Sequence, residues 1–152
     1  MLLLRHASAG ERRSQPSLDR ERPLDRRGRA DARALREAFH GYVVDRIVTS
    51  PHARCVETIR PFAEAAGLPI EVRDELAPTA DGEHALAVLD ELPDAALVCT
   101  HREVIERLFG GEIACEKGGA WLLARREGVL RPAAYLPPPS SVERTRIHRA
   151  AV

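Results

Sequence analysis

Two unbroken apolar runs, each followed by a histidine, constrain the fold of this chain more than any other feature. The first covers residues 2–4 and leads into Arg5 and His6, and the second covers residues 95–100 and leads into His101. Continuous apolar runs of this kind indicate strands that are buried on both faces, as in a parallel sheet covered by helices. Ligands bind outside the carboxyl ends of such strands, so both histidines are expected near a ligand site.

The rest of the chain alternates between helical and strand-like patterns. Ser50 followed by Pro51 predicts a helix start, with Ser50 as the N-cap residue. Helices are expected at residues 24–39, 50–66, 85–92 and 102–108, and further strands at residues 43–49, 70–72, 120–125 and 133–136, the last two as an antiparallel edge. This alternation predicts an α/β fold, a three-layer sandwich with a mostly parallel central sheet flanked by helices.

The length and the apolar content predict a single domain. The chain has 152 residues and is 44% apolar, which suffices for one core without a disulfide or metal staple. Residues 1–136 are expected to form this domain, with a mobile loop at residues 7–23. The Pro-rich segment 137–152 has no apolar period and is expected to be an extended or disordered tail.

Charge and cysteine content exclude several classes of protein. Lys+Arg and Asp+Glu both number 23, so the chain lacks the positive field of a dedicated nucleic-acid binder. The three cysteines are widely spaced, which argues against a disulfide framework and a zinc knuckle. The leading apolar run is too short for a signal peptide or a membrane helix, so a cytoplasmic location is expected. The sequence does not indicate an oligomeric state.

Two histidines and two arginines are expected to converge at the carboxyl edge of the predicted sheet. Arg5 and His6 follow one strand, His101 follows another, and Arg54 lies one turn into the helix predicted to start at Ser50. Guanidinium groups clamp phosphoryl oxygens bidentately, and the arginines lower the pKa of His6, which keeps its imidazole neutral and nucleophilic. These residues predict covalent catalysis through a phosphohistidine, without a metal or a cofactor.

Five short motifs carry a family resemblance over residues 1–125. They are Leu3-Leu4-Arg5-His6-Ala7, Arg22-Pro23-Leu24 with Gly28, Ser50-Pro51-His52-Ala53-Arg54 with Thr58, Glu75-Leu76-Ala77-Pro78, and Val98-Cys99-Thr100-His101. With these motifs in this order, the chain resembles the histidine phosphatase superfamily, the phosphoglycerate-mutase-like proteins. Within that superfamily it looks most like the short SixA-type phosphohistidine phosphatases.

The resemblance implies a role for each matching residue. His6 is the nucleophile that accepts the phosphoryl group, while Arg5, Arg54 and His101 bind that group and stabilise the transition state. The family usually needs an acid that protonates the leaving oxygen, and Glu75 stands at the matching position. The alternative for Glu75 is a surface ion pair. A phosphoramidate substrate has less need of an acid, because its leaving nitrogen can be protonated beforehand.

Two features depart from the family pattern, and a third adds to it. Ala7 replaces the glycine of the signature, and a positive φ would strain an alanine there. Arg102 and Glu103 follow His101, where many relatives carry small or apolar residues. The loop before the first helix holds four arginines, which either read further phosphates of a substrate or are solvated beside acidic neighbours: Arg12, Arg13, Arg20 and Arg22.

Together these observations predict a metal-independent phosphatase with a phosphohistidine intermediate, acting on phosphohistidine in proteins. The first alternative keeps the mechanism and changes the substrate to a nucleotide or a small phosphomonoester. It gains weight because similar domains occur fused behind Nudix hydrolases and this chain starts abruptly at its first strand. The second alternative is a non-catalytic module that binds phosphorylated partners. A zinc hydrolase that uses His and Cys has little support.

Overall fold

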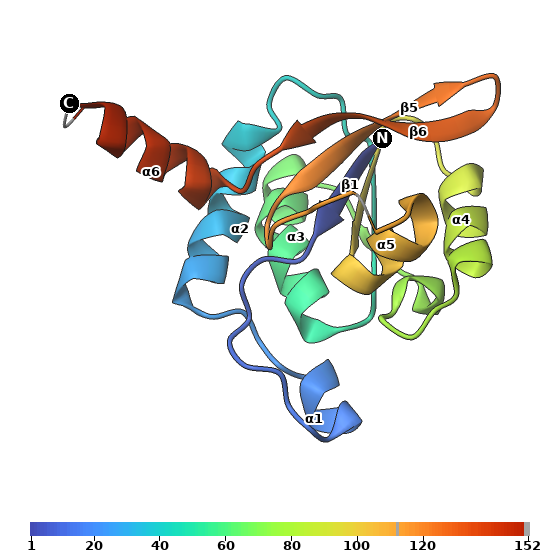
Figure 1. Cartoon of the computed structure of the whole chain (residues 1–152), viewed down its shortest axis with the longest axis horizontal. Coiled ribbons are helices and arrows are strands. Elements are labelled where there is room, and N and C mark those ends of the chain that lie inside the picture. Colours follow the sequence, from blue (N-terminus) through green and yellow to red (C-terminus); the bar gives the residue numbers. More distant parts are fainter. Residues whose placement is uncertain (112, 151–152) are drawn as a thin grey trace.

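The computed structural model describes residues 1–111 and 113–150 and is built around one six-stranded sheet (Figure 1). The strand order is β3-β2-β4-β1-β5-β6. The first four strands in that order run parallel and the last two form an antiparallel edge. Their bounds are β1 Leu2–Arg5, β2 Arg46–Thr49, β3 Ile70–Val72, β4 Ala96–Thr100, β5 Ala120–Arg126 and β6 Val129–Leu136.

Helices cover both faces of the sheet, which confirms the predicted α/β sandwich. In Figure 1, α2 and α3 lie on one side and α4 and α5 on the other. A short helix, α1, lies between β1 and α2, a 3₁₀ helix follows β3, and α6 projects from the body. The bounds are α1 Pro16–Arg20, α2 Arg26–Ala38, α3 Ala53–Ala66, the 3₁₀ helix Asp74–Leu76, α4 Gly82–Glu91, α5 Arg102–Phe109 and α6 Pro139–Ala150.

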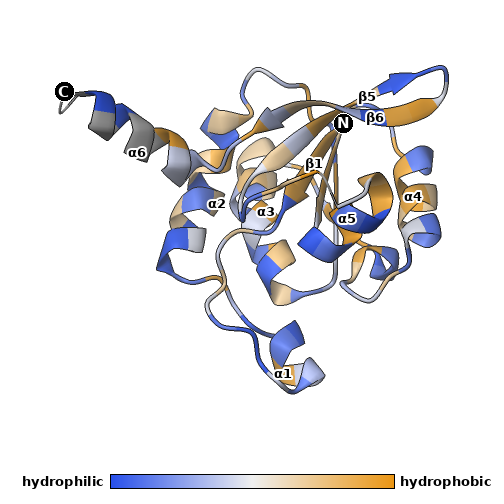
Figure 2. Ribbon diagram, viewed as in Figure 1, coloured by the Kyte–Doolittle hydropathy of each residue, from blue (hydrophilic) through white to orange (hydrophobic). Residues whose placement is uncertain are grey.

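The buried strands contribute side chains to the cores on both faces of the sheet, as their unbroken apolar runs predict. In β1, Leu2 and Leu4 pack in the cluster that includes Leu35 and Ile59, towards α2 and α3. Leu3 points to the opposite cluster, towards α4 and α5. Because successive side chains of a strand point to opposite faces, only a strand buried on both sides can be apolar at every position. Figure 2 shows these strands as mainly hydrophobic ribbons inside the sandwich.

The helix that follows β2 starts later than predicted. Its N-cap residue is His52 and its first helical residue is Ala53, so the prediction of Ser50 as N-cap is wrong. The Ser50 side chain instead hydrogen-bonds to His101. Two other sandwich helices have side-chain caps, since Asp25 accepts from the Gly28 amide at the start of α2 and Asp81 accepts from the His84 amide in α4.

The C-terminal segment is a helix over Pro139–Ala150, so the prediction of an extended or disordered tail is wrong there. Asp31 of α2 is buried, and it accepts hydrogen bonds from the amide and the hydroxyl of Ser140 at 2.7 and 3.0 Å. These contacts satisfy donors in the first turn of α6, as an N-cap side chain would. Residues 151–152 lie outside the described residues.

Among the residues that the structure describes, no helix combines the length and the apolar character needed to cross a membrane.

Candidate active site

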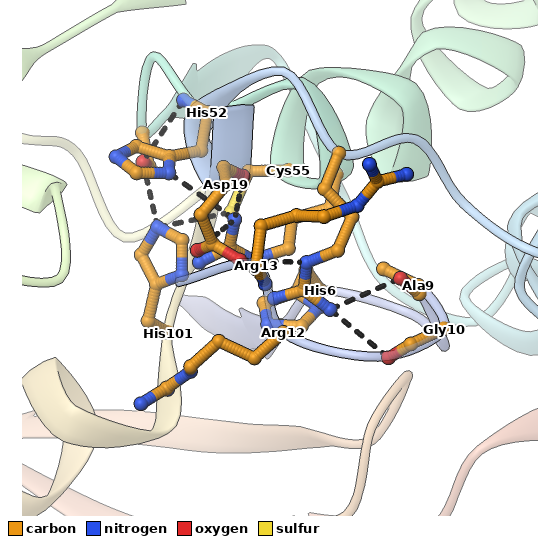
Figure 3. A network of polar contacts seen from close by, with 12 residues as sticks. His6, Ala9, Gly10, Arg12, Arg13, Asp19, His52, Cys55 and His101 are labelled. Atoms are coloured by element: carbon orange, nitrogen blue, oxygen red, sulfur yellow. Dashed lines mark hydrogen bonds and ion pairs between the residues drawn. The ribbon is translucent and has the colours of Figure 1, made fainter. Parts of the chain in front are cut away.

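The carboxyl ends of β1, β2 and β4 bring the predicted residues together. The His6 amide donates to the Thr100 carbonyl at 3.0 Å, and the Ser50 amide donates to the Cys99 carbonyl at 3.0 Å, which extends the sheet by one residue at each strand end. The rings of His6 and His101 consequently lie 5.3 Å apart between centroids, edge to face. Figure 3 shows these rings with their polar neighbours.

His6 is neutral and has a defined tautomer. Its Nδ1 lies 2.8 Å from the Ala7 carbonyl oxygen, which can only accept, so Nδ1 carries the proton and Nε2 keeps its lone pair. Burial lowers the pKa of His6 to about 3, and Arg54 and Arg5 add to this effect against the opposing hydrogen bond to Ala7. Near neutral pH the side chain is therefore unprotonated, and Nε2 is the ring nitrogen with a free lone pair.

In His101, the ring nitrogen that is hydrogen-bonded to the protein is Nε2, whereas in His6 it is Nδ1. The Ser50 hydroxyl lies 2.8 Å from Nε2 of His101 and accepts a hydrogen bond from the His52 amide at 3.3 Å. A hydroxyl has one proton and two lone pairs, so with the His52 amide on one lone pair Ser50 is able to donate its proton to Nε2, which places the His101 proton on Nδ1. Sequence analysis took Ser50 for a helix cap and missed this role. The motif position alone held no signal for it, because the contact spans 51 residues.

Three buried N–H groups of the predicted residues have no hydrogen-bond partner in the protein. They are Nε of Arg5, Nε of Arg54 and Nδ1 of His101. Buried polar groups in folded proteins are almost always hydrogen-bonded, so donors without a partner call for an explanation. Two of these three donors are cationic, which favours an anion with several acceptor oxygens as their partner.

Other contacts hold both guanidinium groups in place. Nη1 of Arg5 donates to the Cys115 carbonyl at 2.7 Å. Arg54 is only 2% exposed, and its Nη1 donates to the Asp19 carbonyl at 2.9 Å and to Nδ1 of His52 at 3.2 Å. Because one end of each guanidinium is bonded to the protein, the orientation of its remaining N–H groups is fixed.

Asp19 and Arg22 belong to the site although sequence analysis gave neither a catalytic role. The Asp19 carboxylate accepts from Nε of Arg22 at 3.0 Å and lies 3.4 Å from Nη1 of Arg54. Arg22 is buried and also donates to the carbonyls of Ala9 and Gly10. The predicted set of exposed loop arginines therefore includes one that is part of the framework. The motif Arg22-Pro23-Leu24 was its only sequence signal.

Glu75 is not brought to this cluster. It lies in the 3₁₀ helix after β3 and pairs with Arg73, with Nη2 of Arg73 3.3 Å from its carboxylate. The hydrogen bond from Arg73 lowers the pKa of Glu75. Over residues 1–111 and 113–150, no hydrogen bond or ion pair joins Glu75 to His6, Arg54 or His101. Its geometry is that of the alternative interpretation, a carboxylate in a surface ion pair.

Ala7 fits its position without strain. Glu127 is the one non-glycine residue with a positive φ in the described part of the chain, so Ala7 has an ordinary backbone conformation. Its amide donates to Oγ1 of Thr58 at 3.0 Å, and its side chain is fully buried. The replacement of glycine therefore leaves the backbone around His6 intact.

The residues after His101 form the rim of the site. Glu103 pairs with Arg12 of the loop at 2.7 Å, and Arg102 pairs with Glu106 one turn along α5 at 3.6 Å.

Cys55, Cys99 and Cys115 are free and buried. Within the described ranges, no group of three or more His, Cys, Asp or Glu side chains is arranged to hold a metal ion.

Comparison with known proteins matches this arrangement to one family. The family described as histidine phosphatase superfamily (branch 1) matches residues 1–85, a segment that contains His6 and Arg54. The chain belongs to the histidine phosphatase superfamily. The resemblance found in the sequence motifs is confirmed.

Similar members of the histidine phosphatase superfamily differ in length. An 8-oxo-(d)GTP phosphatase from Mycolicibacterium smegmatis is 34% identical over 157 residues, which cover 91% of this chain and 48% of that protein. The chain therefore spans about half the length of this relative.

Solved structures share the fold over nearly their whole length. The protein histidine phosphatase SixA complexed with tungstate superposes with a TM-score of 0.75 at 22% identity, over 93% of this chain and 97% of that one. A mycobacterial glucosyl-3-phosphoglycerate phosphatase has a TM-score of 0.71 at 18% identity, over 91% and 98%. At these identities the likeness establishes the fold, and the substrate has to be argued from the site.

Proposed function

We propose that this chain is a metal-independent phosphatase that forms a phosphohistidine on Nε2 of His6. The observation that carries the proposal is the set of three buried N–H groups without partners, on Arg5, Arg54 and His101, beside a neutral His6. A phosphoryl group offers oxygens to all three donors and a phosphorus atom to the imidazole.

The reaction consists of two displacements at phosphorus. First, the Nε2 lone pair of His6 attacks phosphorus, and the bond from phosphorus to the leaving oxygen or nitrogen breaks. The leaving group departs with the electron pair and takes up a proton. Second, a water oxygen attacks the phosphohistidine, the P–N bond breaks, the lone pair returns to Nε2, and the water releases a proton. The products are the dephosphorylated substrate and inorganic phosphate.

The surrounding donors stabilise the charge that develops on the phosphoryl oxygens. Arg5 and Arg54 supply fixed positive charge, and the His101 Nδ1 proton supplies a hydrogen bond without a charge. These groups are already oriented by contacts with Cys115, Asp19 and Ser50, so they need little reorganisation during the reaction. The proposal assigns the neutralisation of the phosphoryl oxygens to these side chains.

Turnover of a generic aryl phosphate in EDTA tests this proposal. We expect phosphate release by the wild-type protein and none above background by His6→Ala, because the nucleophile is lost. His84→Ala is the matched control, since the His84 side chain is 73% exposed on α4, away from the cluster. Equal turnover by wild type and His6→Ala, or loss of wild-type turnover in EDTA, would contradict the mechanism. Binding of phosphoesters without turnover would favour the non-catalytic module.

Phosphohistidine in proteins is the first substrate candidate. Glu75 is paired with Arg73 and forms no hydrogen bond or ion pair with His6 or Arg54, so the described residues offer no established acid for an oxygen leaving group. A phosphoramidate needs less help, because its leaving nitrogen can be protonated before the P–N bond breaks. This difference favours phosphohistidine over a phosphomonoester.

A nucleotide or other small phosphoester is the second candidate. The relative that is 34% identical to this chain is an 8-oxo-(d)GTP phosphatase. In addition, His6 is only 6% exposed and His101 is fully buried, so the site as it stands is closed to a bulky substrate. Both observations favour a small phosphorylated molecule.

A direct comparison separates the two candidates. The wild-type protein is assayed with a histidine-containing protein domain phosphorylated by phosphoramidate, and separately with nucleoside phosphates. We expect the higher kcat/KM for the phosphohistidine domain. A higher kcat/KM for a nucleotide would assign the chain to the second candidate and leave the His6 mechanism unchanged.

A further inference from the structure

Residues 10–21, called the lid below, form a segment that buries almost nothing. Every lid residue is exposed except Asp19, which is partly buried, and α1 has no buried residue. Figure 1 shows α1 standing off from the sandwich, and Figure 2 shows the lid as mainly hydrophilic. Polar contacts, with no apolar core, hold this segment on the body of the protein. Segments with few buried apolar contacts open at low free-energy cost.

Asp19 makes the contacts that fasten the lid to the buried part of the site. Its carboxylate accepts from Nε of Arg22 and lies 3.4 Å from Nη1 of Arg54, and its carbonyl accepts from the same Nη1 at 2.9 Å. The carboxylate also accepts from the Arg13 amide at 2.9 Å within the lid. Burial alone would raise the pKa of Asp19, but the Arg13 amide, Arg54 and Arg22 together lower it. The Asp19 carboxyl group is therefore ionised near neutral pH.

The lid contacts one helix on each face of the sheet. Asp19 contacts Arg54 of α3 on one face of the sheet, while Arg12 pairs with Glu103 of α5 on the other face. The Arg12 side chain is 67% exposed, and exposed ion pairs contribute little stability. Gly10, the first residue of the lid, is held by the Asp25 carboxylate and by Nη1 of Arg22. Beyond this end, the contacts of Asp19 with two buried arginines are the main fastening of the lid.

We propose that Asp19 is a latch that holds the lid closed over His6, and that it thereby determines the size of substrate that reaches the nucleophile. This inference rests on the proposed function, in which His6 attacks phosphorus. A small phosphoester needs only a limited opening of the lid. A phosphoryl group on a folded protein requires the open state, so the apparent kcat/KM for such a substrate is reduced by the fraction of molecules that are open.

Asp19→Asn separates the charge of the latch from its shape. Asparagine keeps an oxygen that accepts from Arg22 and from the Arg13 amide, but it removes the attraction to the two guanidinium groups. Glu21→Gln is the matched control, because it makes the same change of charge in the same segment at an exposed residue whose side chain has no hydrogen bond or ion pair in the structure.

The first measurement is the rate at which diethyl pyrocarbonate modifies His6, relative to exposed His84 of the same molecule, determined by peptide mass spectrometry. An open lid exposes Nε2 of His6. We therefore expect the His6 to His84 ratio to rise on the order of tenfold in Asp19→Asn and to stay at the wild-type value in Glu21→Gln. This measurement needs no turnover, so it tests the latch even if the proposed function fails.

The second measurement compares the turnover of the same phosphate ester in a small substrate and in a bulky one. Phenyl phosphate is assayed free and attached through its ring to a carrier protein. The ratio of kcat/KM for the attached form to that for the free form is expected to rise about fivefold in Asp19→Asn. Any effect of the substitution on the orientation of Arg54 acts on both forms and leaves this ratio unchanged.

An unchanged His6 to His84 ratio in Asp19→Asn would overturn the latch. Equal changes in Asp19→Asn and Glu21→Gln would also overturn it, because they would assign the effect to net charge alone. A failure of the proposed function looks different, since it would appear as absence of turnover in the wild-type protein with both forms of phenyl phosphate.

Discussion

The position of the ring proton in each of the two central histidines follows from the hydrogen bonds of that ring. The Ala7 carbonyl holds the proton of His6 on Nδ1, and the Ser50 hydroxyl holds that of His101 on its own Nδ1. As a result, one imidazole presents a lone pair and the other presents an N–H group. The proposed function uses this difference, with His6 as the nucleophile and His101 as the hydrogen-bond donor, although the two side chains are chemically identical.

The lowered pKa of His6 predicts how stability depends on pH. Burial, with Arg54 and Arg5, lowers this pKa to about 3, whereas an unfolded histidine titrates near 6.5. Between these values the unfolded chain binds a proton that the folded protein does not bind. The free energy of unfolding therefore falls as the pH falls through this window, by up to about 1.4 kcal/mol per pH unit for each such histidine.

His6→Asn removes this contribution, so its unfolding free energy is expected to decline less steeply with acid than that of the wild type. Urea unfolding of both proteins at several values from about pH 7 to about pH 5 gives the two slopes. Parallel slopes would show that His6 is not kept neutral by its surroundings.

Sequence analysis found Arg5, His6, Arg54 and His101 and missed the contacts that hold them in place. Arg5, His6 and His101 follow apolar runs, so the topology of a parallel sheet alone places them together. The contacts of Ser50 with His101 and of Asp19 with Arg54 join residues that are far apart in the chain, and only the folded structure shows them.

At the scale of elements, the loop after β1 is fixed by its close approach to α2. The Ser8 hydroxyl and the Gly10 amide both donate to the Asp25 carboxylate, which also caps α2 through the Gly28 amide. The backbone of Ser8 packs against Gly28 so tightly that a Cβ there would collide with the Ser8 carbonyl oxygen. This contact holds the backbone that follows His6 against the sandwich.

Gly28→Ala is expected to destabilise the protein by about 2 kcal/mol or more, because backbone has to move to accommodate the methyl group. Gly41→Ala is the matched control, since a Cβ at Gly41 meets nothing within 4 Å. Chemical denaturation of the three proteins measures the difference. If the two variants are equally stable, α2 does not approach the loop as closely as the structure shows.

A contact between two helices explains why the C-terminal helix was not predicted. Residues 137–152 have no apolar period, so no amphipathic pattern indicated a helix there. The first turn of α6 is fastened by Asp31, a buried carboxylate of α2 that lies 109 residues away from Ser140. A cap that comes from another helix leaves no pattern in the local sequence.

At the scale of the whole molecule, the candidate catalytic residues lie at one edge of the sheet, and the lid is proposed to control access to them. The parallel order of β2, β4 and β1 brings three strand ends together, and the alternation of helices and strands was enough to predict this. In the proposal above the lid closes over that edge, and its closed position depends on the charges of Asp19, Arg22 and Arg54, which leave no periodic pattern in the sequence. The fold was therefore more predictable than the access to the site.

Trapping of the covalent intermediate tests the central claim most directly. The wild-type protein is mixed with a radiolabelled phosphoester and quenched in alkali before the first turnover is complete, since phosphohistidine survives in base, and the labelled peptides are then identified. The account predicts label on Nε2 of His6 in the wild type and no label in His6→Ala. Label on any other residue, or rapid wild-type turnover that leaves His6 unlabelled at every quench time, would contradict it.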